Sequence, residues 1–172
     1  MKKCGIFLIL ALLLAGCGAQ ETFETVSDEL VTPAAATVQQ IVVELPDSAV
    51  SPVMQTQSGE IYFCENYTIT RQITESGDLE KTVRAVSGFS PDQLQIMQTQ
   101  WENAKRYDFV WSAAGETGQM LYRCCILDDG NYHYILTASV DAQQAGQLQE
   151  TWRQMFDSFC LVSADFPLNT GS

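Results

Sequence analysis

The chain has 172 residues, of which 46% are hydrophobic and 17% are charged. This length suits one domain of ordinary size, and the composition is globular rather than collagen-like or wholly disordered. Nine Lys and Arg residues against 21 Asp and Glu residues give a formal net charge of −12. Because binding to phosphate backbones needs a basic stripe, this balance excludes nucleic acid as an expected partner.

The amino terminus is typical of an export signal. It begins with the positive segment MKK and continues into the apolar run IFLILALLL. This run is shorter than the roughly 20 apolar residues that span a bilayer, but it suits the core of a signal peptide. Leu14-Ala15-Gly16-Cys17 follows and resembles the lipobox of bacterial lipoproteins. The alternatives are an ordinary secretory signal with a chance cysteine, or an uncleaved single anchor.

The lipobox resemblance implies that Cys17 receives a diacylglycerol and that the chain is cleaved between Gly16 and Cys17. Residues 1–16 would then be a lipoprotein signal peptide. Two acyl chains would contribute on the order of 20 kcal/mol of membrane affinity, at about 0.8 kcal/mol per buried methylene. We therefore expect the protein to be held at the cell membrane by the lipid on Cys17, facing the outside of the cytoplasm, on an outer leaflet or in a periplasm.

Residues 17–40 are predicted to be the lipidated cysteine and a flexible acidic tether. The segment is rich in Thr, Ala, Glu and Gln and shows no sustained apolar period, so it cannot bury enough surface to offset its ordering entropy. No Lys or Arg occurs between residues 4 and 70, whereas eight acidic residues do. This acidity would repel anionic lipid and hold the domain off the membrane; alternatively, it only keeps the tether soluble.

The globular domain is expected at residues 41–163, followed by a tail at 164–172. Its first half is predicted to contain three short strands and two helical segments. These are strands at 41–45, 60–65 and 68–73, a helix capped by Asp78 and ended by Gly88, and a helical turn with a capping box from Ser90 through Pro91 to Gln93.

The second half of the domain is rich in aromatic and β-branched residues and has short Asn-, Asp- or Gly-containing connections. It predicts a four-stranded antiparallel meander at 95–101, 105–113, 119–127 and 131–140. Asp141 is expected to cap the longest helix, and a short strand at 158–162 should close the unit. The apolar stripe of that helix comprises Ala145, Leu148, Trp152, Met155 and Phe156. The fold class is therefore α+β, with an antiparallel sheet flanked by a long C-terminal helix and a shorter one.

The end of the domain resembles PsbP-like domains. The residues concerned are the strand YHYIL at 132–136, the helix after it, and Asp157-Ser158-Phe159. The resemblance covers residues 105–163 and is one of pattern. It implies an antiparallel sheet flanked by helices and no catalysis, since that fold serves mostly in binding or assembly.

Four cysteines remain once Cys4 and Cys17 are set aside: Cys64, Cys124, Cys125 and Cys160. Outside the cytoplasm they allow two disulfides, in which Cys124 or Cys125 pairs with Cys64 or Cys160 across the sheet. Neighbours on one strand point to opposite faces, so a bond between Cys124 and Cys125 would be strained. The alternative is free, buried thiols. Without a CxxC motif, no metal site is expected.

Catalytic motifs are not apparent. His133, the single histidine, lies between Tyr132 and Tyr134, and we expect it to face outward with the tyrosines inward. No nucleophile elbow accompanies it. Asp128-Asp129-Gly130 predicts a hairpin turn rather than a calcium loop, and the acidic residues are expected at exposed turns and helix surfaces.

These observations favour a non-catalytic binding or accessory module of the cell envelope, with a protein partner and no cofactor. Two alternatives stay open. One is an extracytoplasmic hydrolase that uses surface carboxylates, and the other is a thiol-active envelope protein built on Cys124 and Cys125.

Overall fold

A computed structural model describes residues 37–162, with gaps at 102 and 117. The predicted signal peptide, the lipid site at Cys17, most of the tether and the tail lie outside the described residues. Nine strands form two sheets within the described ranges.

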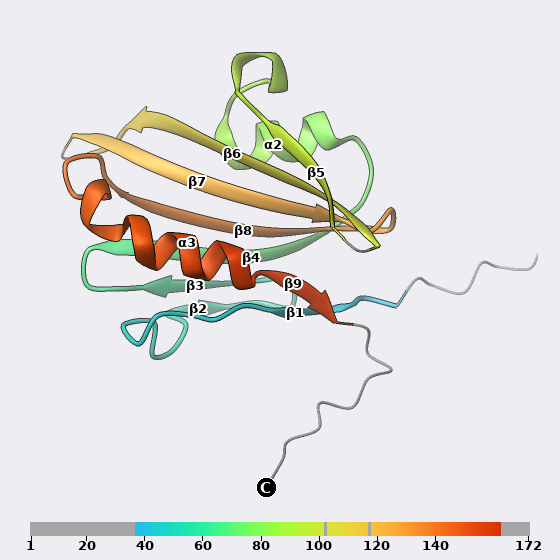
Figure 1. The fold of residues 1–172 in the computed structure, drawn as a ribbon, viewed down its shortest axis with the longest axis horizontal. Helices are drawn as coiled ribbons and strands as arrows, with labels where there is room; N and C mark the ends of the chain where they lie inside the picture. Colours follow the sequence, from blue (N-terminus) through green and yellow to red (C-terminus); the bar gives the residue numbers. More distant parts are fainter. Residues whose placement is uncertain (1–36, 102, 117, 163–172) are drawn as a thin grey trace, which may run out of the picture. The chain divides into compact units, whose positions relative to one another are not determined.

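The large sheet is antiparallel throughout and has seven strands in the order β2-β3-β4-β8-β7-β6-β5 (Figure 1). Their bounds are β2 Met54–Gln55, β3 Gly59–Phe63, β4 Tyr67–Glu75, β5 Met97–Trp101, β6 Ala104–Ala114, β7 Gln119–Asp128 and β8 Tyr132–Asp141. Strands β5 to β8 are the predicted meander. The predicted α+β architecture is confirmed.

Two α-helices flank the sheet on opposite faces (Figure 1). They are α2, Leu79–Ser87, and α3, Gln149–Ser158. As predicted, the Asp78 carboxylate accepts the N–H of Glu80 at the start of α2, and Gly88 ends the helix with a φ of 80°, a left-handed conformation that favours glycine. A 3₁₀ helix at Pro91–Gln93 carries the predicted capping box with Ser90.

The helix near the carboxyl end begins later than predicted. Asp141 ends strand β8, and its carboxylate accepts the N–H of Gln143 at 2.9 Å in a local turn. A 3₁₀ helix at Ala145–Leu148 then leads into α3. The Asp141 side chain closes this turn instead of capping a helix, because Asp readily bonds to a backbone N–H two residues on.

The first strand also differs from the prediction. Strand β1 covers Gln40–Val42 only, and it pairs antiparallel with β9, Cys160–Val162, in a separate two-stranded sheet. Strand β2, which the sequence did not predict, has two residues and pairs with β3.

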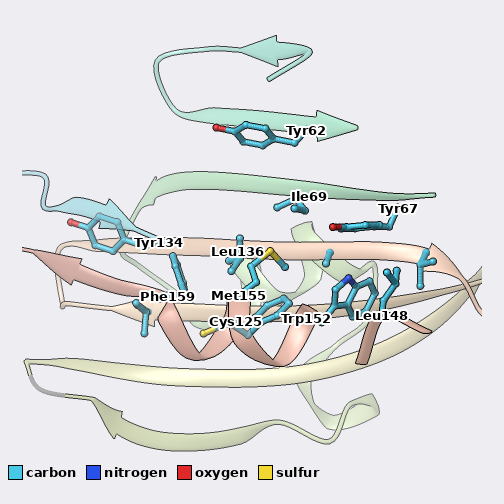
Figure 2. Close-up of a cluster of buried hydrophobic side chains, with 14 of the residues drawn as sticks. Tyr62, Tyr67, Ile69, Cys125, Tyr134, Leu136, Leu148, Trp152, Met155 and Phe159 are labelled. Carbon is cyan, nitrogen blue, oxygen red and sulfur yellow. The ribbon is translucent and has the colours of Figure 1, made fainter. Parts of the chain in front are cut away.

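Each helix packs on its own cluster of buried side chains. The α3 cluster contains the predicted stripe, with Trp152 against Tyr67 and Met155 beside Leu136 and Ile69 (Figure 2). The α2 cluster joins Val83 to the aromatic residues Tyr107, Phe109 and Trp111 of β6. Because both faces of the central strands are covered, residues 133–136 of β8 are buried without alternation.

Truncating a side chain of the α3 cluster should cost far more stability than truncating an exposed one. Phe156 is fully buried, whereas Phe63 is 64% exposed. We expect Phe156→Ala to lower the free energy of unfolding by about 3–5 kcal/mol, and Phe63→Ala to change it by less than about 1 kcal/mol. Urea unfolding of the two variants followed by circular dichroism checks this, and equal losses would contradict the packing described.

Candidate binding groove

The candidate site is a groove beside β5, where α3 leaves part of the sheet uncovered. It has a volume of about 290 Å³. Its walls come from three strands and the end of α3, and the lining residues are Met97, Thr99, Trp101, Arg106, Asp108, Arg123 and Asp157. Met97 lies opposite Asp108 and Thr99 opposite Arg106 in the β5–β6 ladder, so these side chains share one face of the sheet.

Arg106 forms the floor of the groove and is buried. Its Nε donates to Asp108 Oδ2 at 2.6 Å, and its Nη2 donates to Asp108 Oδ1 at 3.1 Å. Nη2 also donates to the carbonyl oxygen of Phe156 at 2.9 Å. Burial disfavours the charge, but Asp108 outweighs burial, and the pKa of Arg106 is raised. These bonds join β6 to the last turn of α3.

Apolar side chains form the outer wall. The Trp101 ring lies over Arg106, with 5.5 Å between the guanidinium carbon and the ring centroid, a cation–π contact that orients the ring. Trp101 is 36% exposed and Met97 is 61% exposed. The groove therefore combines a rigid polar floor with an open aromatic and thioether edge.

Arg123 completes the groove from β7. Its guanidinium carbon lies 4.3 Å from the centroid of the Phe156 ring. Asp157, on the same side, accepts from Arg153 at 3.2 Å. Among the described residues, Arg123 has no carboxylate within ion-pair distance.

Sequence analysis missed this site in part. The sequence predicts the strand at 95–101 that carries Trp101 and Met97, but it does not single out Arg106 or Arg123 as site residues. In the segment KRYDFVW, Arg106 and Asp108 share one face while the aromatic residues share the other. That alternation was the available signal. No comparable signal predicts that Arg123 and Asp157 line the same groove.

The predicted lipid site at Cys17, with cleavage after Gly16, lies outside the described residues. The four domain cysteines are free thiols in the structure: Cys64, Cys124, Cys125 and Cys160. Cys124 faces the α2 cluster and Cys125 the α3 cluster, and both are fully buried. Burial raises the pKa of Cys124 to about 12 and also raises that of Cys125. Since the thiolate is the reactive form, these two cysteines suit packing better than redox chemistry. Disulfide pairing stays a prediction.

The sequence predicted that His133 faces outward, and this prediction is wrong. His133 is fully buried under α2. Its Nδ1 is 2.7 Å from Thr82 Oγ1, and its Nε2 is 3.5 Å from Ser76 Oγ and 3.8 Å from Asp128 Oδ1. The Ser76 hydroxyl donates to Asp128 at 3.2 Å. Burial lowers the pKa of His133, although Asp128 and Asp129 oppose the shift. The cluster ties α2 to β8 and presents no exposed histidine to a substrate.

Two acidic residues expected at exposed turns or helix surfaces lie partly buried on strands, namely Asp108 and Glu60. Burial opposes ionisation of Glu60, but hydrogen bonds from Arg71 and Tyr62 outweigh it and lower the pKa. Asp129 closes the predicted hairpin turn, and its pKa is lowered because backbone N–H groups of Tyr132 and Asn131 outweigh burial. A general acid needs a raised pKa, whereas the pKa values of Glu60 and Asp129 are both lowered.

Two further surveys cover only the part of the chain that the structure describes. No cluster of three or more His, Cys, Asp or Glu side chains there is arranged to hold a metal ion. Its helices all fall short of the length and apolar character needed to cross a membrane.

Comparison with known proteins yields similarity of structure only. No protein-family model matches the chain, and no curated protein sequence matches it. LpqN of Mycobacterium tuberculosis is similar with a TM-score of 0.50 and 12% identity, over 73% of this chain and 84% of LpqN. A protein of Bacteroides thetaiotaomicron gives a TM-score of 0.51 and 8% identity over 73% of this chain, which spans 46% of that protein.

The solution structure of a cyanobacterial PsbP from Synechocystis is also similar, with a TM-score of 0.42 and 8% identity, over 77% of this chain and 99% of PsbP. PsbP is thus among the similar solved structures, but a score this low supports no functional inference. The likeness to LpqN and to the Bacteroides protein is one of fold alone.

The buried histidine should make stability depend on pH. The folded-state pKa of His133 lies below the unfolded value of about 6.5, so the unfolded chain takes up the proton first as pH falls. We therefore expect the free energy of unfolding to decline below about pH 6.5, until the folded-state pKa is passed. His133→Asn should be less stable by about 1–3 kcal/mol at pH 7.5 and should show a flatter profile between pH 7.5 and 5. Urea unfolding across this range checks it, and equal slopes would contradict it.

Proposed function

We propose that the protein is a lipid-anchored extracytoplasmic lipoprotein whose α+β domain is a non-catalytic binding module of the cell envelope. The sequence Leu14-Ala15-Gly16-Cys17 supports the anchor. In this account the lipid on Cys17 binds the membrane, and the acidic tether lets the domain reach a protein partner.

The observation that carries the binding role is the groove beside β5. Its floor is held by the Arg106–Asp108 pair, and its open edge exposes Trp101 and Met97. Trp, Met and Arg are enriched in protein interfaces because they give large contact areas with specific polar geometry. A rigid groove of this composition suits recognition.

The likeness to LpqN is compatible with this role. LpqN is described as involved in cell envelope biogenesis of Mycobacterium tuberculosis. At 12% identity only the fold is shared, so support for an envelope location comes from the resemblance of Leu14-Ala15-Gly16-Cys17 to a lipobox.

The two alternatives have less support. A hydrolase would need a carboxylate held protonated near neutral pH, whereas the pKa values of Glu60 and Asp129 are lowered. A thiol-active protein would need an accessible thiolate, whereas Cys124 and Cys125 are fully buried. We therefore propose that the protein is not an enzyme.

The test is photo-crosslinking in cells with a photoreactive residue at position 101. We expect a discrete crosslinked product in the membrane fraction, since the groove faces a partner held near the same membrane. The same residue in place of Val50, which is 89% exposed and outside the groove, is the matched control. Adding Cys17→Ala should release the protein from the membrane and abolish the product.

Equal crosslinking from positions 101 and 50 would contradict the binding role. Membrane retention of the Cys17→Ala protein would contradict the lipid anchor, whatever the crosslinking pattern.

A further inference from the structure

We propose that a second cavity, between β1 and the β2–β3 hairpin, binds a neutral sugar through side-chain amides and hydroxyl groups. The cavity shares no lining residue with the groove beside β5. This inference therefore adds a site to the domain and does not depend on what the groove binds.

The cavity is lined by segments that are distant in the chain. Strand β1 forms one wall, the turn between β2 and β3 forms the other, and β3 and β4 supply the floor (Figure 1). Its volume is about 360 Å³, which is within the range of small-molecule sites. The sheet ladders place Gln55 opposite Glu60, and Glu60 opposite Arg71. These three side chains therefore form one row on one face of the sheet.

The floor of the cavity is a fixed ion pair. Arg71 donates through Nε to Glu60 Oε2 at 2.9 Å, and its Nη2 donates to the same oxygen. Glu60 also accepts from the Tyr62 hydroxyl at 3.0 Å and from Gln55 Nε2 at 3.0 Å. The two charges compensate each other, and the lining that the structure describes contains no further charged residue. The cavity therefore suits a neutral ligand better than an ion.

Most of the lining is polar and uncharged. Five glutamines contribute side-chain amides, and Thr56 and Ser58 contribute hydroxyl groups. Within the described ranges, no hydrogen bond engages the side-chain amide of Gln40 or Gln57, and both residues are exposed. Each amide offers a donor beside an acceptor, and each sugar hydroxyl can both donate and accept. These free amides can therefore bond to adjacent hydroxyl groups of one sugar ring.

The wall that carries Gln57 is held in place by main-chain bonds. The Thr56 N–H donates to the carbonyl oxygen of Gly59 at 2.8 Å, and the Ser58 N–H donates to Thr56 Oγ1 at 3.3 Å. The Ile73 N–H donates to the carbonyl oxygen of Ser58 at 2.8 Å, which ties the turn to β4. A wall fixed in this way loses little freedom when a ligand binds.

The composition of the lining favours a sugar over a peptide. Ile41 and Ile73 are its only large apolar side chains among the described residues, and both are half-buried. They offer a small apolar surface for the C–H face of a sugar ring. An extended peptide needs separate pockets for its alternate side chains, and two isoleucines do not provide them.

The test is saturation-transfer NMR on full-length protein purified from membranes in zwitterionic detergent micelles, with empty micelles as the blank. The probes are the methyl glycosides of glucose, galactose, mannose, rhamnose, N-acetylglucosamine and N-acetylgalactosamine at millimolar concentration. Acetyl-trialanine amide, an uncharged peptide, is the comparison ligand. We expect saturation transfer to at least one glycoside and none to the peptide.

The double variant Gln40→Ala, Gln57→Ala should bind that glycoside about tenfold more weakly, because it removes two amides that bond to the ligand. The matched control is Gln143→Ala, Gln147→Ala, which removes two exposed glutamines outside the cavity and should leave the affinity unchanged. Equal urea unfolding midpoints of the two double variants show that both keep the fold.

Absence of saturation transfer to all six glycosides, transfer to the peptide alone, or equal affinity of the two double variants for the glycoside would overturn the proposal. Crosslinking from position 101 tests the groove and not this cavity, since Trp101 lies outside it. A failure of either proposal is therefore recognised independently of the other.

Discussion

The groove depends on one buried ionic interaction, that of Arg106 with Asp108 and with the carbonyl oxygen of Phe156. A guanidinium buried without partners would cost several kcal/mol, so separating Arg106 from Asp108 or from the carbonyl would strongly destabilise the domain. Because the carbonyl belongs to the last turn of α3, the interaction fixes the end of that helix over β6. Asp157 follows Phe156 directly, and its place in the groove follows from the same constraint.

Because helices cover both faces of the sheet, the histidine and the two strand cysteines are buried and their pKa values are shifted. With α2 on one face and α3 on the other, the central strands β7 and β8 are buried on both sides. These strands carry the three side chains with the chemistry for catalysis or thiol exchange, and all three are fully buried: His133, Cys124 and Cys125. Their pKa values shift towards the neutral forms because burial penalises charge. The same side chains on an edge strand would have been accessible.

Local signals in the sequence predicted much of the fold. The Asp78 cap and Gly88 fixed the bounds of α2, and the short connections between strands predicted the meander. Pairings between distant segments could not be predicted in the same way. The β1–β9 pair joins Ile41 to Leu161, and no local pattern specifies such a partner. His133 was misplaced because alternation describes a strand with one exposed face, whereas β8 has none. Arg123 and Asp157 line the same groove only because α3 packs on the sheet, and single-strand patterns do not report that packing.

If a partner in the envelope covers the groove face of the sheet, as proposed above, methionine oxidation measures that coverage directly. Met97 lies in the groove and is 61% exposed, while Met54, on the opposite edge strand and outside the groove, is 58% exposed. In purified protein the two should oxidise at similar rates under dilute peroxide, because their exposure is nearly equal. In intact cells, mass spectrometry should find Met97 protected several-fold relative to Met54. Equal oxidation of the two residues in cells would contradict the account.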